Sequence, residues 1–480
     1  MPVIEPENFR LAKLQELRRL GVDPYGGRFP GTVPLRELAS QFDQQQGRVV
    51  RAAGRVTHVR AMGKASFLVI KDWTGTIQLY FQLDRLGPDR FHIHKQLEPG
   101  DIVGVQGELS KTRTGEVTIF VGEFAVLAKA LLSPPEKWHG LRDVEKRCRQ
   151  RYVDLFTNED VVAGFRKRFE IIRAMREFLQ ARGFVEVETP MMQLIPGGAV
   201  ARPFRTHHNA LDVDLYLRIA PELYLKRLLV GGMEKVFEIN RNFRNEGISS
   251  HHNPEFTMLE VYEAYGDYET MMELTEQLVC HLAEQVCGSL VLPYGEAQVG
   301  YTPPWRRAKF WDLLEQQAGL GRGDEPAIRA AAERMGMEGS RTDHPEYLAY
   351  RIFEKAVEGT LVQPTFVTHY PTSISPLAKA APDDPAVAQR FELFIAGMEI
   401  APAYTELNDP QEQEKRFLAQ VGHEEERERV DRDFVRALAY GMPPAGGLGL
   451  GVDRLVMALT DKPTIREVIL FPLLRPEENA

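Results

Sequence analysis

Short β-forming segments broken by glycine turns occupy residues 48–131, and they limit this part of the chain to a small all-β fold. The segments are rich in Val, Ile, Phe and Thr, and only residues 85–97 among them are typical of a helix. Strands at this spacing predict a five-stranded barrel of the OB-fold kind, which binds oligonucleotides on an exposed strand face. Phe67 and Gln78 are candidate contacts on that face.

A helix is expected before the barrel, and a charged linker with prolines follows it at residues 131–155. The charge is uneven: residues 1–150 hold 23 Lys and Arg against 17 Asp and Glu, whereas the whole chain has a net charge of −9. A basic front half suits contact with a polyanion, although a solvated charged face explains the same pattern. The apolar stripe of the first helix is Phe9, Leu14, Leu17 and Leu20.

The rest of the chain mixes helix and strand without a regular period. A long amphipathic helix is predicted over residues 164–182, and a strand follows as far as Pro190. The glycine-rich stretch "GGLGLGVDR" contains no GxGxxG, so a doubly wound parallel sheet is not indicated. These patterns predict two domains, residues 1–145 and 146–480, with a helical insertion or flank at about 277–354.

Composition argues against several other classes of protein. With 43% apolar and 26% charged residues the chain is ordinary for a globular protein, and it has no run of about 18 apolar residues. The N-terminus lacks the apolar core of a signal peptide. Three cysteines without a CxxC pair argue against a disulfide framework and a zinc site. We expect a cytoplasmic protein with no membrane partner.

The stretch "NRNFRNEGISSHHNPEF" sets an ordered group of polar residues before an aromatic ring. If its first part is a strand that continues to Glu246, then Arg244 and Glu246 face the same side. If the chain returns as an antiparallel strand, Phe256, Glu260 and Tyr262 converge on that side. An Arg suits a phosphate oxygen, a Phe stacks on a purine, and a Glu accepts from an exocyclic amine. This surface predicts a nucleoside triphosphate substrate.

A sheet face with a solvated Arg–Glu pair explains any one of these residues equally well, but two further clusters call for the same ligand. In the predicted hairpin "RFELFIAGMEIAP", with its turn at residues 396–397, Phe394 faces Glu399 and Glu392 lies diagonally on the same face. Such carboxylates repel unless a cation lies between them, and oxygen ligands suit Mg²⁺ that bridges phosphates. In "GGLGLGVDRLVMAL", a bare strand leads into a helix with Arg454 near its N-terminus, a good polyphosphate site.

The same segments contain three motifs of a known family. The chain resembles a bacterial-type class II lysyl-tRNA synthetase over nearly its whole length, through "GFVEVETP", "FRNEG…HNPEF" and "GLGLGVDR" in that order. "IPGGAVARPF", "YLRIAPELYLKRL", "HYPTSISPLAK" and "YTELND" resemble the lysine member more than the aspartyl and asparaginyl members. The resemblance implies an α+β protein: an OB-fold anticodon-binding domain, and a catalytic domain with an antiparallel sheet flanked by helices.

The resemblance also implies residue roles at the nucleotide. Arg244 would be catalytic by holding the α-phosphate of ATP and the lysine carboxylate, and Arg454 would hold the outer phosphates with His252. Glu392 and Glu399 would bind Mg²⁺, with more than one ion per subunit. Adenosine would be held by Glu246, Asn253 and Phe256.

Further roles concern lysine and tRNA. Gly198 and Glu222 would lie near the α-amino group of lysine. The remaining lysine-binding residues would be Glu260, Tyr262 and Glu406, the last two at the ε-ammonium. The anticodon would be read by Phe67, Gln78 and Glu116.

Two positions depart from the family pattern. His251 stands where relatives commonly have Arg, and Pro402 stands where they often have Asn. A regular strand from Glu399 would also point Glu406 away from the pocket. Because Pro inside a strand is usual at an edge or a bulge, we expect a bulge here that returns Glu406 to the pocket.

The resemblance implies a homodimeric enzyme that activates L-lysine with ATP and transfers it to lysine tRNA. Two alternatives remain open from the sequence. One is a ligase that attaches lysine to a protein, for which the barrel would have no purpose. The other is a catalytically inactive nucleic-acid-binding or amino-acid-sensing relative, which only His251 and Pro402 favour.

Overall fold

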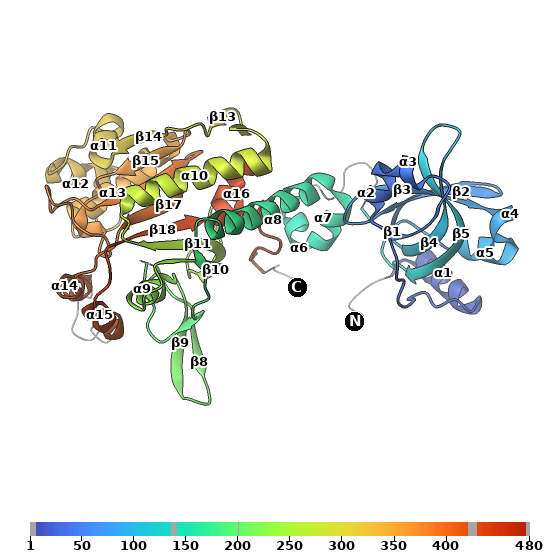
Figure 1. Ribbon diagram of the computed structural model, residues 1–480, viewed down its shortest axis with the longest axis horizontal. Helices are drawn as coiled ribbons and strands as arrows, with labels where there is room; N and C mark the ends of the chain where they lie inside the picture. The colour runs from blue at the N-terminus through green and yellow to red at the C-terminus, as the bar shows by residue number, and fades with distance from the viewer. Residues whose placement is uncertain (1–5, 136–140, 142, 200, 421–429, 477–480) are drawn as a thin grey trace. The chain divides into compact units, whose positions relative to one another are not determined.

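The computed structural model describes residues 6–135, 141, 143–199, 201–420 and 430–476, with the side chain of Gln420 excepted. Their packing separates into two compact units, Met1–Glu159 and Asp160–Ala480 (Figure 1). The first unit extends past the boundary predicted at residue 145, because two short helices belong to it. These helices are α6 (Val144–Arg149) and α7 (Arg151–Thr157), in the second half of the predicted linker. Residues 136–140 and 142 of the linker lie outside the described part.

The first unit is a closed barrel of five strands in the order β1-β2-β3-β5-β4, which confirms the predicted OB-fold architecture. Neighbouring strands are antiparallel except β3 and β5, which are parallel. Alternate side chains of β2 and β3 are buried, as the pleat requires. The strands are β1 (Val49–Met62), β2 (Ala65–Lys71), β3 (Thr76–Gln82), β4 (Ile102–Lys111) and β5 (Val117–Ala128).

Short helices accompany the barrel, and the first of them lies before it in the chain as predicted. Leu14 and Leu17 of α1 are buried, and Leu17 belongs to the barrel core. Phe9 was predicted on the same apolar stripe, which is wrong, because its side chain is 50% exposed. The helices of this unit are α1 (Asn8–Arg19), α2 (Leu35–Ser40), α3 (Phe42–Gln45), α4 (Leu83–Leu86) and α5 (Pro88–His94).

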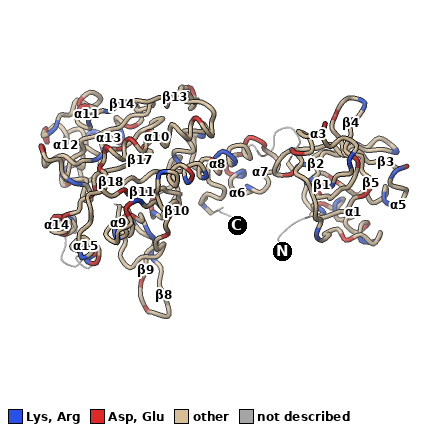
Figure 2. Tube along the Cα trace, viewed as in Figure 1, with Lys and Arg blue, Asp and Glu red and all other residues tan. Residues whose placement is uncertain are grey.

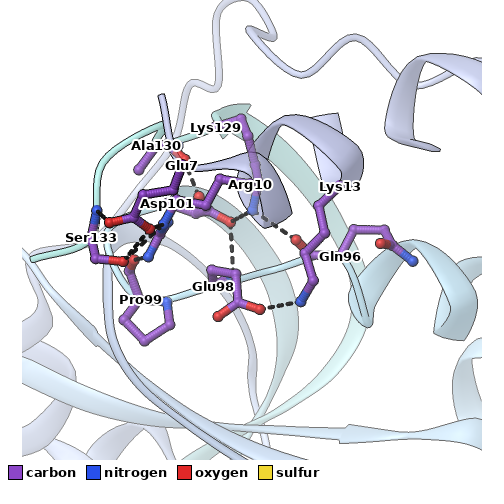
Figure 3. A network of polar contacts seen from close by, with 10 residues as sticks. All are labelled: Glu7, Arg10, Lys13, Gln96, Glu98, Pro99, Asp101, Lys129, Ala130 and Ser133. Carbon is purple, nitrogen blue, oxygen red and sulfur yellow. Dashed lines mark hydrogen bonds and ion pairs between the residues drawn. The ribbon is translucent and has the colours of Figure 1, made fainter. Parts of the chain in front are cut away.

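A network of polar contacts joins α1 to the barrel (Figure 3). At its centre the Lys129 ammonium lies 2.7 Å from the Asp101 carboxylate, and both side chains are completely buried. Lys129 also donates to the backbone oxygen of Gln96 at 2.8 Å. Arg10 of α1 is nearly buried and donates to the backbone oxygen of Pro99 at 2.9 Å. Charged groups therefore hold the first helix, in addition to its apolar contacts.

The second unit is built on an eight-stranded sheet in the order β14-β15-β16-β17-β18-β11-β10-β6. Its neighbours are antiparallel except β14–β15 and β10–β6, so the predicted α+β class and antiparallel sheet are confirmed. The strands are β6 (Val185–Glu186), β10 (Lys235–Phe243), β11 (Glu255–Ala264), β14 (Arg306–Lys309), β15 (Thr365–Thr368), β16 (Arg390–Ile395), β17 (Met398–Thr405) and β18 (Ala445–Gly451).

The two faces of the central strands carry different chemistry. Leu259 and Val261 of β11, with Leu448 of β18, belong to the main core, to which α8, α10 and α16 contribute their apolar sides (Figure 1). Phe256 and Glu260 of β11 line a cavity on the other face, as strand parity predicts. The longer helices are α8 (Glu159–Gln180), which begins five residues earlier than predicted, α9 (Glu222–Val230), α10 (Tyr268–Cys287) and α16 (Val452–Thr460).

A helical insertion or flank was predicted at about residues 277–354, and the structure has both helices and strands there. The segment includes a two-stranded sheet, and its strand β14 extends the edge of the main sheet. Helices α11, α12 and α13 pack around a core of their own. The elements are β12 (Val291–Tyr294), β13 (Ala297–Gly300), α11 (Phe310–Ala318), α12 (Glu325–Arg334) and α13 (Pro345–Ala356).

The remaining elements are short. Only Val185 and Glu186 of the strand predicted up to Pro190 are paired in the main sheet. A three-stranded sheet has the order β7-β9-β8. These elements are β7 (Met192–Gln193), β8 (Arg205–His208), β9 (Val213–Leu217), α14 (Pro410–Gln420), α15 (Arg432–Ala439) and the 3₁₀ turns Glu358–Thr360, Thr372–Ile374 and Ile465–Glu467.

We expect Lys129→Met to destabilise the barrel by about 3–5 kcal/mol, because it leaves the Asp101 carboxylate buried without a cation. Hydrogen exchange of peptides from β1 to β5, measured by mass spectrometry in the full chain, reports this loss separately from the second unit. Lys13→Met is the matched control, since its ion pair with Glu98 is partly exposed and contributes less than about 1 kcal/mol. Equal exchange in the two variants would contradict the role of the buried pair.

Candidate active site

A cavity of about 1520 Å³ opens on the sheet face opposite to the main core. A single drug-sized ligand site is typically 300–1,000 Å³, so this cavity has room for two small substrates together. All but one of the catalytic-unit residues singled out from the sequence line it, and the exception is Glu406. The lining set is Gly198, Glu222, Arg244, Glu246, His252, Asn253, Phe256, Glu260, Tyr262, Glu392, Glu399 and Arg454.

Arg244 is the cation at the centre of this wall. Strand β10 ends at Phe243, so the prediction that the strand continues to Glu246 is wrong and Arg244 lies at the start of the loop. Its guanidinium lies 5.1 Å from the centre of the Phe256 ring, and Nε is buried with no hydrogen-bond partner. Burial lowers the pKa of Arg244, against the attraction of Glu399. Within the described residues no carboxylate forms an ion pair with it, so a ligand anion can bind there.

A second cation stands at the start of α16. Arg454 donates to the Glu399 backbone oxygen at 2.8 Å and to its carboxylate at 3.2 Å. It also lies 2.8 Å from Nε2 of His252, whose Nδ1 is 2.9 Å from the Ser249 hydroxyl. Burial, and then the nearby Arg454 charge, lowers the pKa of His252 to about 4. His252 is therefore neutral at pH 7, and Arg454 supplies the positive charge.

The residues predicted at adenosine differ in how freely they can meet a ligand. Glu246 is exposed on the cavity wall. Asn253 is buried, donates to the Glu255 backbone oxygen at 2.6 Å and accepts from the Leu473 backbone amide at 3.2 Å. Asn253 therefore fixes the loop after β10, whereas Glu246 and the Phe256 ring are open to the cavity.

The two predicted metal ligands lie on the β16–β17 hairpin, in the register expected across its turn. Phe394 pairs with Glu399, and both Glu392 and Glu399 line the cavity. Glu392 is buried, accepts from the Tyr370 hydroxyl at 2.7 Å and forms an ion pair with Arg390. Burial raises the pKa of Glu392, while Arg390 opposes this.

Two further carboxylates beside them were missed by the sequence reading. Glu354 of α13 lines the cavity, and Glu358 accepts from the Glu399 backbone amide at 3.2 Å. Burial, and then repulsion from Glu358, raises the pKa of Glu354 to about 7. Burial, and then repulsion from Glu399, raises the pKa of Glu358 to about 7. The helical spacing of Tyr347, Tyr350 and Glu354 could have indicated a cavity face on α13. A divalent cation would relieve the repulsion among these carboxylates, so the donor set fits Mg²⁺.

At the other end of the cavity, carboxylates and hydroxyls form a buried wall. The Tyr262 hydroxyl donates to Glu260 at 2.9 Å, and the Tyr404 hydroxyl donates to Glu222 at 2.9 Å. Burial, and then repulsion from Glu222, raises the pKa of Glu260 to about 8. Gly198 lies beside Glu222, since a Cβ atom there would be 3.0 Å from the Glu222 Cβ atom. This wall suits a ligand with ammonium groups.

Glu406 lies just behind this wall. It is buried and forms an ion pair with Lys226. A Cβ atom at Gly447, which does line the cavity, would overlap the Glu406 carboxylate and lie 2.6 Å from the Tyr262 ring. Gly447 pairs with Tyr262, so the Glu406 carboxylate fills the space of a missing side chain on the cavity face of β18.

The expected bulge exists but lies at a different residue. Phe394 pairs with Glu399 and Leu393 pairs with Ala401, so Ile400 is the extra residue on β17. The bulge is therefore not at Pro402, where it was expected. Pro402 pairs with Glu392 inside the sheet, and the pairing of β17 with β18 begins only at Ala403. Pro402 has no N–H to donate, and it lies before the first residue of β17 that pairs with β18.

His251 occupies the other position that departs from the family pattern. It is half-buried on the cavity wall, and its Nδ1 lies 3.3 Å from the Ser250 hydroxyl. Burial and the Arg454 charge lower the pKa of His251, which makes it neutral at pH 7. The positive charge expected at this position in relatives is therefore absent.

The barrel carries its own candidate surface. Phe67 pairs across the strands with Tyr80, and their ring centres are 4.8 Å apart. Phe120 continues this aromatic row, 5.3 Å from Tyr80. Gln78 accepts a hydrogen bond from Thr118 at 2.8 Å and is half-buried.

Sequence reasoning found Phe67 and missed Tyr80 and Phe120, which the same strand parity could have indicated. Glu116 is exposed in the turn before β5. Lys111 and Arg113 occupy that turn as well, and Lys and Arg stand out in blue on the barrel trace (Figure 2). Half-buried aromatic rings beside basic side chains are a surface on which nucleic-acid bases can stack.

Known protein families match both the unit that holds the cavity and the barrel. The family model of tRNA synthetases class II (D, K and N) matches residues 143–475, and that of the OB-fold nucleic acid binding domain matches residues 50–127. A lysine–tRNA ligase of Pelotomaculum thermopropionicum is 54% identical, over 98% of this chain and 94% of its own length. The chain belongs to the class II lysyl-tRNA synthetases.

Other members of the lysyl-tRNA synthetase family are similarly close. The lysine–tRNA ligases of Syntrophomonas wolfei and Carboxydothermus hydrogenoformans are each 52% identical, over 99% and 98% of this chain and 98% of their own lengths. The family generally uses Mg²⁺, in keeping with the carboxylates of the cavity. Among the described residues, no helix combines the length and apolar character needed to cross a bilayer.

We expect Mg²⁺ to stabilise the protein more at pH 8 than at pH 6. At pH 6 the carboxyl groups of Glu354 and Glu358, with pKa values of about 7, hold protons that the cation must displace. The melting temperature, measured with and without Mg²⁺ at both pH values, tests this. Glu358→Gln should reduce the pH dependence, whereas Glu273→Gln on the exposed side of α10 should leave it unchanged. An equal Mg²⁺ effect at both pH values would contradict the crowded carboxylates.

Proposed function

We propose that this synthetase activates L-lysine with ATP to lysyl-adenylate and transfers lysine to its tRNA, with the residue roles set out below. The observation that carries the proposal is the half-buried guanidinium of Arg244, which has no ion-pair partner among the described residues and stands between Arg454 at one end of the cavity and Glu260 at the other. A cation without a partner in such a wall is costly unless a ligand anion binds to it. Both ATP and lysine bring an anion.

In this proposal one end of the cavity receives ATP. Phe256 offers its ring to adenine, and Glu246 and Asn253 hold the adenosine. Arg244 binds the α-phosphate, while Arg454 binds the outer phosphates beside the neutral His252. The start of α16 adds its own favourable electrostatic field for a polyphosphate.

Magnesium would be held by Glu392 and Glu399, with more than one ion per subunit. Among the described residues no three His, Cys, Asp or Glu side chains form a metal cage, so phosphate oxygens would complete the ligand set. When bound, Mg²⁺ neutralises phosphate charge. Arg390 fixes the Glu392 carboxylate and thereby orients one ligand.

The other end of the cavity would receive lysine. Gly198 leaves space beside Glu222 for the α-ammonium, while Glu260, Tyr262 and Glu406 recognise the ε-ammonium on the face of β18 that Gly447 leaves bare. A pocket that pairs a desolvated ammonium with carboxylates rejects side chains that lack it, because the carboxylates would then be left unpaired.

The reaction needs no protein nucleophile. The lysine carboxylate attacks the α-phosphorus in line, one O–P bond forms, and the bond to the leaving diphosphate breaks. Arg244 holds both reacting groups and offsets the charge that develops between them, so catalysis comes from positioning and electrostatics. A terminal hydroxyl of tRNA then attacks the acyl carbon of the adenylate and releases AMP.

We propose that the two domains divide this work. The N-terminal domain, residues 1–145 with its helix and barrel, would bind the anticodon at Phe67, Gln78 and Glu116, and the stacking surface would include Tyr80. Residues 146–480 would carry out both chemical steps. We further propose a cytoplasmic homodimer. Support comes from the odd count of three cysteines without a CxxC pair and from exposed apolar side chains on β6 and on the segment that follows it in the chain: Val185, Met192 and Leu194.

Arg244→Ala should lower lysine-dependent ATP–diphosphate exchange by about 100-fold or more, because a charge contact made in the transition state is lost. Arg241→Ala, on the strand that ends just before Arg244, is the matched control. Its side chain is partly exposed and pairs with Glu255, so exchange should stay within a few-fold of the wild type. Exchange by Arg244→Ala at the level of the control would refute the assignment. Charging of lysine tRNA in the same preparations separates this enzyme from a protein-lysine ligase.

Gly447→Ala should raise the KM for lysine about tenfold or more while changing the KM for ATP little. The new methyl group displaces the Glu406 carboxylate and crowds Tyr262, and overpacking of this kind costs about 1–3 kcal/mol. On the same strand, a Cβ atom at Gly451 would lie 3.6 Å from its nearest neighbour, so Gly451→Ala should retain the lysine KM. Unchanged lysine binding by Gly447→Ala would place the ε-ammonium elsewhere.

A further inference from the structure

Lys226 is a lysine of the protein buried inside the wall that would recognise substrate lysine. Its side chain is completely buried on the second turn of α9, and its ammonium lies 2.7 Å from the Glu222 carboxylate. The same ammonium forms an ion pair with Glu406. One cation therefore joins the carboxylates assigned to the two different ammonium groups of the substrate.

These two carboxylates come from distant parts of the chain. Glu222 begins α9, one turn before Lys226, while Glu406 follows β17 and is fixed through its backbone amide to Ala445 at 2.8 Å. The face of the Tyr404 ring lies 5.6 Å from the Lys226 ammonium, and the Tyr404 hydroxyl donates to Glu222. Nothing in the sequence spacing would set the distance between Glu222 and Glu406, but their shared cation does.

The wall holds more carboxyl groups than one cation can pair. Glu260 adds a third carboxyl group, with the Tyr262 hydroxyl bound to it and a pKa raised to about 8. Burial alone would lower the pKa of Lys226, but Glu222 and Glu406 outweigh it and raise that pKa, so Lys226 stays an ammonium. Burial raises the pKa of Glu406, and the foremost influence that lowers it is Lys226. Removing the cation would therefore leave Glu406 protonated over a wider pH range.

We propose that Lys226 is a positioning residue for amino-acid recognition, which holds Glu222 and Glu406 at one separation and supplies their counter-charge. The inference rests on the proposed lysine site. A substrate with two amines can then bind with one amine at each carboxylate, and the fixed separation of the carboxylates selects the length of the substrate. A purely structural ion pair would instead hold α9 against the sheet without affecting how the pocket reads lysine.

The first test is Lys226→Met, which keeps the length of the side chain and removes the charge. We expect the KM for lysine in ATP–diphosphate exchange to rise 30-fold or more at pH 7, and the KM for ATP to stay within threefold. The defect should shrink as the pH rises from 6.5 to 8.5, because Glu406 must lose its proton before it can bind an ammonium. The groups facing Lys226 that can contribute to this profile are Glu222 on α9, Glu260 and Tyr262 on β11, Tyr404 on β17, and Glu406.

Two outcomes would overturn the proposal. One is a lysine KM within threefold of the wild type. The other is a loss that affects ATP and lysine equally and does not change with pH, as expected of a structural pair. Lys129→Met is the matched control, because it removes another completely buried lysine–carboxylate pair, and its lysine KM should equal that of the wild type. If wild-type exchange does not depend on lysine, the proposed function fails rather than this inference.

A second variant covers the case in which Lys226→Met does not fold. Lys226→Met combined with Glu406→Gln removes the cation and one carboxylate together, so less uncompensated charge remains in the wall. If Lys226 acts through Glu406, the double variant should bind lysine no more than threefold more weakly than Glu406→Gln alone. A further loss of 30-fold in the double variant would show that Lys226 acts independently of Glu406, and would overturn the proposal.

Discussion

The second unit depends on holding several carboxyl groups close together on one face of a sheet. A buried carboxylate is costly unless a cation or hydrogen-bond donors compensate it, and the wall here meets that cost with its own cations. Arg390 pairs with Glu392, and Lys226 pairs with Glu406. Arg244 is half-buried and has no such partner in the described part of the chain. The protein thus pairs these charges with one another and leaves the Arg244 cation for the anion of a ligand. The position of Arg244 then determines how the ligand is oriented in the cavity.

Much of this arrangement could be predicted from the sequence because it follows strand geometry. The period of two puts Phe256, Glu260 and Tyr262 on one face of β11, and the two-residue turn of the β16–β17 hairpin fixes the pairing of Phe394 with Glu399. The barrel was equally accessible, because its strands alternate regularly and are separated by glycine turns. Where local periodicity determines the direction of a side chain, one sequence is enough.

The rest depends on distances that no local pattern encodes. The bulge lies at Ile400 because the two strands of the hairpin differ by one residue, and the proline two positions later gave a misleading signal. Lys226 lies on a helix whose apolar stripe is ordinary, and nothing nearby in the sequence indicates that it meets Glu406. Glu354 ends the predicted helical flank and Glu358 lies just beyond it, and no local pattern shows that either meets Glu399. Tertiary packing alone brings these groups together.

The absence of a side chain at Gly447 has a consequence for how this pocket can change over time. Because the Glu406 carboxylate lies where a side chain at position 447 would stand, residue 447 and residue 406 share one small volume. Neither can grow unless the other shrinks, and a shorter acid at position 406 would leave a void that only a side chain at 447 could fill. The route to a different amino-acid preference therefore passes through paired substitutions, and single-site libraries or stepwise drift would miss it.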